Sequence, residues 1–214
     1  MIRASHASAP SAATLFATLL ATLLATLSAA TPAGAAPETY LIDPAHTFPQ
    51  FEVDHLGYSR HRGRFNRTSG RIVIDREAKS GSLEVNIDTT SIDTGDEKLE
   101  AILRSDAFFD AGQHPSLRFR STGFLFNDDR PVAIDGEFTL LGITRPLRLE
   151  LDHFRCGLVV IGLRYVCGAN ATAKFSRSAF GMDRYVNFGV GDEVRITIQV
   201  EAQREDPAPT IVNP

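Results

Sequence analysis

The stretch PVAIDGEFTLLGITRPLRLEL, residues 131–151, decides the fold. Apolar residues occupy alternate positions in both of its halves: Val132, Ile134, Phe138 and Leu140, with Gly136 between them, and then Leu147, Leu149 and Leu151. This alternation is the pattern of β-strands that bury one face. Leu141–Thr144, which contains Gly142, separates the halves as a turn. The stretch therefore predicts an antiparallel β-hairpin.

The same period of two recurs on both sides of this hairpin, and eight strands can be counted in all. The other six are marked by Phe48–Val53, by Ile72 and Ile74, by Leu83, Val85 and Ile87, by Leu117 and Phe119 with Phe124 and Phe126 further on, by Ala171, Ala173 and Phe175, and by Val194, Ile196, Ile198 and Val200. Eight antiparallel strands in one small domain form a sandwich or a closed barrel, and closure removes exposed strand edges. Strands of 8–10 residues would give walls roughly 26–33 Å long at about 3.3 Å per residue.

One segment departs from the strand pattern. TGDEKLEAILRS, residues Thr94–Ser105, has apolar residues at helical spacing, between the third and fourth strands. Thr94 and Glu97 are spaced as a capping box, and Arg104 lies in the last turn. The segment predicts one short amphipathic helix of about three turns.

Composition excludes several classes of protein. The 214 residues include 22 basic and 26 acidic side chains, for a net charge of −4, which argues against general nucleic-acid binding. The 16 glycines and 11 prolines are too few for collagen or low-complexity disorder. Fourteen phenylalanines against four tyrosines and no tryptophan is an unusual aromatic set.

The two ends of the chain are expected to lie outside the barrel. Residues 1–35 read as a cleaved secretory signal peptide, with an apolar run at Ala13–Ala30 and small residues at Ala33 and Ala35. A membrane anchor is the alternative, because about 18 residues can just span a bilayer. Residues 205–214 are rich in proline and are expected to form a flexible tail.

Cys156 and Cys167 are the only two cysteines of the chain. In an oxidising compartment an even pair forms a disulfide by default, and free buried thiols are the alternative. Two cysteines alone cannot complete a metal site, and their spacing is not that of a redox motif.

Four separated motifs resemble the YceI-like family of exported, lipocalin-like, polyisoprenoid-binding proteins. They are YLIDPAHTFPQFEVDH (Tyr40–His55), TGDEKLEAILRSDAFFDAGQHPSLRFRST (Thr94–Thr122), GEFTLLGITRPLRLEL (Gly136–Leu151) and FSRSAFGM (Phe175–Met182). The resemblance covers residues 38–204 and implies an all-β, extended, eight-stranded antiparallel barrel whose lumen holds a polyprenyl chain or another long amphipathic lipid. It also implies a periplasmic location. Many members carry Asp-Glu-His-Leu in the helix, where this chain has Glu100–Leu103.

If the barrel is hollow, part of the phenylalanine set should line it, whereas a solid core would use the rings as filler. The residues expected to contact lipid are Phe51, Phe65, Phe108, Phe109, Phe119, Phe138, Phe180 and Met182. The expected polar or head-group contacts are His46, His55, Arg62 and Arg64. Arg145 is expected to fix its hairpin through hydrogen bonds.

Two features admit a second interpretation. His46 and His55 could act as bases or metal ligands, but the sequence has no nucleophile motif and no ligand cluster to join them. The segment Gly57–Arg67 carries Arg60, Arg62, Arg64 and Arg67 and is either a solvated strand face or a site for an anionic head group.

The sequence therefore favours an exported binding protein without catalytic activity or cofactor, whose partner is a long-chain lipid. It is expected to be a monomer or homodimer. One alternative is a non-enzymatic stress-response partner of a membrane redox protein, since some relatives are fused to b-type cytochromes. A less favoured one is a lipid-acting enzyme that uses His46 or His55.

Overall fold

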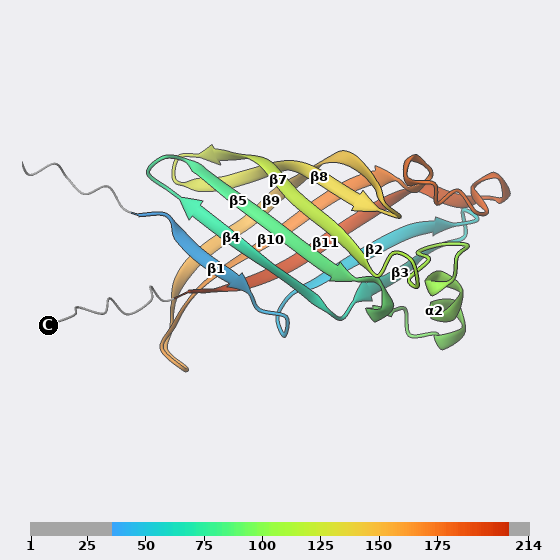
Figure 1. The fold of residues 1–214 in the computed structure, drawn as a ribbon, viewed down its shortest axis with the longest axis horizontal. Helices are drawn as coiled ribbons and strands as arrows, with labels where there is room; N and C mark the ends of the chain where they lie inside the picture. Colours follow the sequence, from blue (N-terminus) through green and yellow to red (C-terminus); the bar gives the residue numbers. More distant parts are fainter. Residues whose placement is uncertain (1–35, 206–214) are drawn as a thin grey trace, which may run out of the picture. The chain divides into compact units, whose positions relative to one another are not determined.

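The computed structural model describes residues 36–205, which form an elongated β-barrel with one helix at one end (Figure 1). The segment predicted as a signal peptide, residues 1–35, lies outside the described residues, as does all but the first residue of the predicted tail.

The described elements follow one another in chain order. They are β1 (Glu38–Ile42), β2 (Phe48–His55), β3 (Ser59–Phe65), β4 (Thr68–Asp75), β5 (Ser80–Asp88), η1 (Thr89–Ser91), β6 (Ile92–Asp93), α2 (Glu97–Arg104), β7 (Ser116–Asn127), β8 (Arg130–Leu140), β9 (Ile143–Val159), β10 (Arg164–Ser176), η2 (Arg177–Phe180), η3 (Val186–Phe188) and β11 (Val190–Arg204).

Eight of these strands close into a ring in which every pairing is antiparallel. The order is β1-β4-β5-β7-β8-β9-β10-β11, and β11 pairs with β1 to complete it. The remaining strands extend the wall at the helix end, where β2 pairs with β11, β3 with β2, and β6 with β3. Three strands of the barrel are therefore interrupted, each forming two elements: β1 with β2, β3 with β4, and β5 with β6. The predicted eight-stranded antiparallel barrel is confirmed.

The interruption between β1 and β2 has a local cause. Pro44 has no N–H group and cannot donate to the ladder with β11, so the chain turns outward at this point. The buried hydroxyl of Thr47 takes over the missing contacts, because it donates to the carbonyl of Glu201 and accepts from the Glu201 N–H, both at 3.2 Å.

The strands from β7 to β11 are longer than the 8–10 residues expected from the sequence. β9 has 17 residues and β11 has 15, and β10 pairs with β11 without a gap from Val166 to Ser176. A barrel of tilted strands needs such lengths to enclose an elongated interior.

Two bulges change which face a side chain takes. Between Ala133 and Pro131 the register with β7 skips Val132, which therefore points outward, and not inward as the alternation predicted. In β9 a second register shift follows Leu151, so that Phe154 rather than His153 faces the interior.

The helix α2 lies between the third and fourth strands of the ring, as predicted, but begins later than the sequence indicated. Its N-cap is Asp96, whose side chain accepts from the N–H groups of Lys98 and Leu99. The capping box expected of Thr94 and Glu97 is wrong: Glu97 is the first helical residue, and Glu100 accepts the Thr94 N–H at 3.0 Å.

The disulfide predicted from the cysteine pair is present. Cys156 on β9 lies directly opposite Cys167 on β10, and the two sulfurs are bonded. Beyond the bridge the two strands continue for a few residues to the turn at Val160–Leu163.

Removing the bridge should destabilise the barrel. We expect Cys156→Ala/Cys167→Ala to lower the free energy of unfolding by about 2–4 kcal/mol, because closing a loop of about 12 residues restricts the unfolded chain. Urea denaturation with and without reductant measures this. Reduced wild-type protein should match the double variant, and an oxidised wild type no more stable than the variant would contradict the prediction.

Candidate functional site

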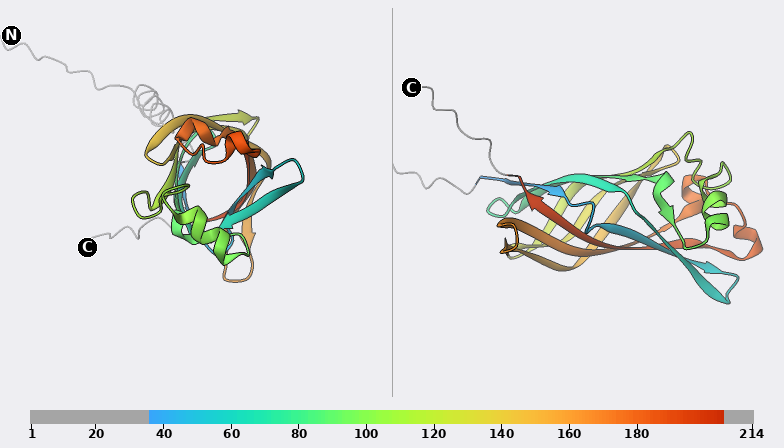
Figure 2. Two further views of the ribbon diagram at one scale, coloured as in Figure 1. Left: turned by 90° about the vertical axis from the view of Figure 1, so that its right-hand side faces the viewer. Right: turned by 90° about the horizontal axis from the view of Figure 1, so that it is seen from below.

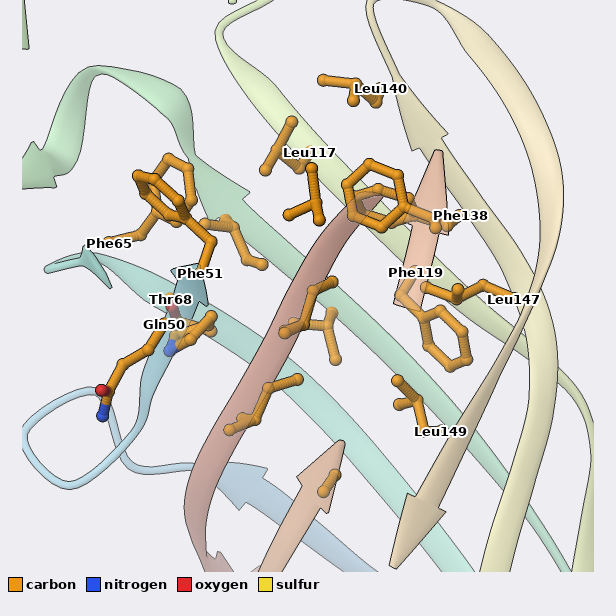
Figure 3. Close-up of a pocket in the computed structure, with 18 of the residues that line it drawn as sticks. Gln50, Phe51, Phe65, Thr68, Leu117, Phe119, Phe138, Leu140, Leu147 and Leu149 are labelled. Atoms are coloured by element: carbon orange, nitrogen blue, oxygen red, sulfur yellow. The ribbon is translucent and has the colours of Figure 1, made fainter. Parts of the chain in front are cut away.

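The interior of the barrel contains a cavity of about 390 Å³. Leucine, isoleucine, valine and phenylalanine side chains from all eight strands of the ring face it, and Figure 3 shows several of them converging from opposite walls. The volume lies within the range of sites that bind small molecules.

The phenylalanine rings leave this space open because they lie against the wall. The ring of Phe51 covers Gly63 on the neighbouring strand, where an added Cβ would lie 2.5 Å from it. Phe119 covers Gly136 in the same way, at 2.4 Å. Glycine at these two positions gives each ring room to lie flat rather than project into the lumen.

One end of the lumen is sealed by a second, smaller core. Tyr40, Cys167 and Ala202 are almost fully buried there and pack against the disulfide partner Cys156 and against Phe154. Phe154 also lines the cavity, whereas Tyr40, Cys167 and Ala202 do not, so this cluster forms the floor.

The mouth lies at the opposite end, beneath α2. Leu99, Ile102 and Leu103 of the helix line the cavity together with Phe108 of the following loop and with Tyr185. Their partial exposure, 50% for Ile102 and 45% for Tyr185, shows that the lining continues to the surface here. Figure 2 shows the helix and the neighbouring loops set around this end of the barrel.

A histidine pair forms one side of the mouth. His55 at the end of β2 and His61 on β3 both line the cavity, and their rings stack with centroids 4.0 Å apart and planes at 10°. The neighbouring polar residues Asp54 and Arg62 also line the cavity, so this side of the mouth is polar.

Arg177 is a buried cation at the rim. Its guanidinium donates to the carbonyl oxygens of Gly191 and Met182, both at 2.8 Å, and of Val190 at 3.2 Å. Burial lowers the pKa of this side chain. The bonds to Gly191 and Val190 fasten η2 to the start of β11, and the bond to Met182 holds the loop that follows η2.

Thr68 is a polar exception on the apolar wall. Its hydroxyl is buried and has no hydrogen-bond partner among the described residues, and it lines the cavity beside Gln50 (Figure 3). A buried hydroxyl without a partner carries a desolvation cost.

The structure brings most of the residues expected from the sequence to the lumen. Those that line it are Phe51, Phe65, Phe108, Phe109, Phe119, Phe138, Met182, His55 and Arg62. Three others lie elsewhere: Phe180, His46 and Arg64 are not part of the lining.

Phe180 lies behind the wall rather than in it. Only 1% of its surface is exposed, and its ring packs edge-on against Phe138 and Phe175 at 5.6 and 5.3 Å between centroids. It supports two lining rings because η2 folds over them. Arg145 also differs from expectation: it donates to the carbonyl of Ala179 in η2 at 3.3 Å, and so links its hairpin to this turn.

His46 lies at the outer turn between β1 and β2. Its Nδ1 lies 2.9 Å from Oδ2 of Asp43, and this hydrogen bond raises the pKa of His46 and lowers the pKa of Asp43. His46 thus belongs to the turn and is not itself part of the lining, although the next residue, Thr47, is.

The arginines of Gly57–Arg67 form ion pairs with nearby carboxylates, and their side chains are largely exposed. Arg60 and Arg62 both pair with Glu52 at 2.8 Å, Arg64 pairs with Asp93 at 3.3 Å, and Arg67 with Asp88 at 2.9 Å. The hydrogen bond from Arg62 lowers the pKa of Glu52. Of the two sequence interpretations, this geometry matches the solvated strand face.

Sequence reasoning missed His61, Thr68 and Arg177 as lining residues. His61 shares the parity of Gly63 and Phe65 on β3, and that alternation could have identified it as inward-facing. Thr68 and Arg177 stand at strand ends, where alternation carries no information.

Residues 36–205 contain neither a metal-ligand cluster nor a membrane-spanning helix. No three His, Cys, Asp or Glu side chains gather there as a metal site would require. No helix in the same residues is long and apolar enough to span a bilayer.

Comparison with known proteins gives a family match. The family model described as YceI-like domain matches residues 40–202. A UPF0312 protein of Vibrio parahaemolyticus is 36% identical over 131 residues, 60% of this chain and 69% of the relative. A UPF0312 protein of Shewanella denitrificans is 35% identical over 146 residues, 67% of this chain and 76% of the relative.

Solved structures share the fold. Burkholderia cenocepacia BcnA is similar with a TM-score of 0.60 at 21% identity, covering 75% of this chain and 98% of that one. A polyisoprenoid binding domain from Saccharophagus degradans, implicated in plant cell wall breakdown, has a TM-score of 0.57 at 15% identity and covers 78% and 98%. At these identities the likeness establishes the barrel architecture.

The pairing of His46 with Asp43 predicts a pH dependence. We expect His46 to titrate above the ordinary value of about 6.5 in an NMR titration, and Asp43→Asn to return it to that value. Because the pKa of His46 is raised on folding, the pair favours the folded state below about pH 6.5, and this contribution is lost as pH rises through the folded pKa. An unchanged titration in Asp43→Asn would contradict the assignment.

Proposed function

The chain belongs to the family of YceI-like domains, and from this membership and its apolar lumen we propose that it binds a long-chain lipid of isoprenoid type inside the barrel. The Saccharophagus domain with the same architecture is described as polyisoprenoid binding. The observation that carries the proposal is the combination of a cavity of about 390 Å³ with an almost wholly apolar wall.

The geometry favours one direction for the ligand. The cluster of Tyr40, Cys167 and Ala202 closes the floor of the lumen, and its polar groups, the Tyr40 hydroxyl and the Arg76 guanidinium over Phe154, do not line the cavity. The mouth, in contrast, carries the histidine pair of His55 and His61. An apolar chain therefore enters first, and the polar head group stays at the mouth in contact with water. The lining residues of β11 run from Val190 to Val200, a distance of about 33 Å along the strand. Because strands tilt by about 40° from the barrel axis, this gives a lumen roughly 25 Å long.

The proposed role is that of an exported, periplasmic carrier, store or protector of such a lipid, without catalysis. The disulfide between Cys156 and Cys167 supports an oxidising compartment. The enzyme alternative is weakened by the position of His46 outside the lumen and by the stacking of His55 on another histidine. The open lumen also argues against a purely structural partner of a membrane redox protein.

Chain length should control affinity if the chain is buried in the lumen. We expect binding of a series of linear prenyl alcohols to tighten with length, because each buried CH₂ contributes about 0.8 kcal/mol before binding costs. Affinity should level off once the chain exceeds the lumen of roughly 25 Å. Fluorescence displacement titrations measure the series, and no dependence on length would contradict the lumen as the site.

Wall residues should matter only where they face the lumen. We expect Phe119→Ala and Phe138→Ala to weaken binding by about 1–3 kcal/mol each, since both rings line the cavity as a cross-strand pair. Phe48→Ala is the matched control, because Phe48 faces outward beneath the Arg64 guanidinium. Titration and urea denaturation of each variant separate lost contacts from lost stability. Equal losses of affinity in all three would count against the assignment.

A substitution at Thr68 tests how deep the polar part of the ligand reaches into the lumen. With the head group at the mouth, Thr68→Val should retain or improve the binding of a prenyl chain and should stabilise the apo barrel, because it removes a buried hydroxyl that has no partner. The same titration and denaturation experiments apply. A marked loss of affinity in this isosteric variant would show instead that a ligand oxygen reaches Thr68.

A further inference from the structure

The turn between β9 and β10 exposes a continuous aliphatic surface. Val160, Ile161 and Leu163 are 78%, 85% and 75% exposed, and Leu158 and Val159 before them are also exposed. The hairpin projects from the end of the barrel opposite α2, in orange at the lower left of Figure 1. It does not contribute to the lumen, because none of these five residues lines the cavity.

The composition of this tip is contrary to that of an ordinary hairpin turn. Such turns use glycine, asparagine and aspartate, both for solubility and for backbone angles that other residues avoid. Here Leu163 occupies the left-handed region with φ of 50°, where a bulky aliphatic residue is rare. An apolar side chain is therefore retained at a position where the backbone favours a polar or glycine residue.

The charged residues of the hairpin have one sign. Arg155 and Arg164 are exposed, and no aspartate or glutamate occurs between Asp152 and Asp183 in the sequence. Among the described residues neither arginine forms an ion pair with a carboxylate, unlike the four arginines of Gly57–Arg67. The Nε of Arg164 lies beside the turn, 3.3 Å from where a Cβ of Gly162 would be.

The base of the hairpin is held by covalent and hydrogen bonds. The disulfide joins Cys156 to Cys167 four residues before Val160, and the Leu163 N–H donates to the Val160 carbonyl at 3.3 Å. An apolar tip presented on a preformed hairpin loses little conformational entropy when it binds.

We propose that this hairpin inserts its tip into the surface of a lipid bilayer that contains anionic lipids, with Arg155 and Arg164 at the level of the head groups. Aliphatic side chains at the tip and unpaired arginines just behind it match the order of acyl chains and anionic head groups in a leaflet. A second copy of the chain fits less well, since a stable interface engages 20–30 residues a side and this tip has about six. The proposal does not depend on the ligand of the lumen.

The exposed apolar residues at the mouth are the other surface that could contact a bilayer. Tyr185 and Phe188 pack against each other with ring centroids 6.4 Å apart, and Tyr185 and Ile102 also line the cavity. These side chains thus have a role in the lumen site. The charges beside them have both signs, because the Arg184 guanidinium lies 5.0 Å over the Tyr185 ring and Asp183 precedes Arg184 in the sequence.

A tryptophan placed at each end distinguishes the two surfaces, because the chain has no tryptophan of its own. Ile161→Trp and Phe188→Trp would be purified with the disulfide formed from the periplasm of an expressing bacterium. They are then mixed with vesicles of phosphatidylcholine and phosphatidylglycerol. We expect the emission of Ile161→Trp to shift to shorter wavelength and to be quenched by lipids brominated in the acyl chain. The emission of Phe188→Trp should not change.

Vesicle flotation tests the contributions of the aliphatic tip and of the two arginines separately. Val160→Asn/Ile161→Asn should reduce the bound fraction at least ten-fold, whereas the matched mouth variant Tyr58→Asn/Phe188→Asn should bind as wild type does. Arg155→Gln/Arg164→Gln should weaken binding to vesicles with phosphatidylglycerol by about five-fold per arginine. It should have little effect on phosphatidylcholine alone.

Three results would overturn the proposal: no binding of wild type to either vesicle, a spectral shift confined to Phe188→Trp, or a wild-type dimer that Val160→Asn/Ile161→Asn converts to monomer. The lumen titration on Val160→Asn/Ile161→Asn keeps the two proposals apart. It should match wild type, so a failure of lipid binding in the lumen would be seen independently of the hairpin.

Discussion

Closure of the sheet depends on three residue pairs between β1 and β11, from Tyr40 with Arg204 to Ile42 with Ala202. Without them β1 and the facing end of β11 would be unpaired edges, and the interior would open to water at this end, because β11 pairs with β2 over the rest of its length. Once the ring is closed, strand number, tilt and register are linked, and successive side chains must alternate between lumen and solvent. The buried Tyr40 and Ala202 at this seam also form the floor of the lumen, so one contact closes both the wall and the end of the barrel.

Because side chains alternate, one strand carries cavity-lining residues on one face and ion-paired residues on the other. On β3 the odd positions His61 and Phe65 face the cavity, while Arg64 lies outside the lining and pairs with Asp93, and Arg62 lies at the edge of the lining and pairs with Glu52. Surface pairs of this kind contribute little to stability individually, but they neutralise the outer wall. On the inner wall, glycines beneath the rings of Phe51 and Phe119 keep the aromatic surface flat, and this is why so many phenylalanines leave a cavity.

The period of two made the fold predictable, because it reports burial on one face at each strand, and the family resemblance added the closed topology. The alternation gave wrong side-chain directions where the backbone departs from regular strand pairing. The extra residue Val132 at a bulge turned outward, and a bulge cannot be detected from alternation alone. Phe180 and Arg177 depend on how η2 folds over the rim, which is a tertiary contact without a local pattern. His46 was misplaced because the break at Pro44 takes it out of the strand.

The mouth and the aliphatic hairpin stand at opposite ends of the barrel (Figure 1). If the tip around Ile161 is held in a bilayer, then the mouth at Tyr185 points away from that bilayer. A lipid bound with its chain toward the floor would present its head group to the surrounding space and not to the anchoring membrane. Loading and release then require a second surface or a partner at the mouth. This arrangement favours a tethered store or a transfer between two surfaces over exchange with the membrane that holds the protein.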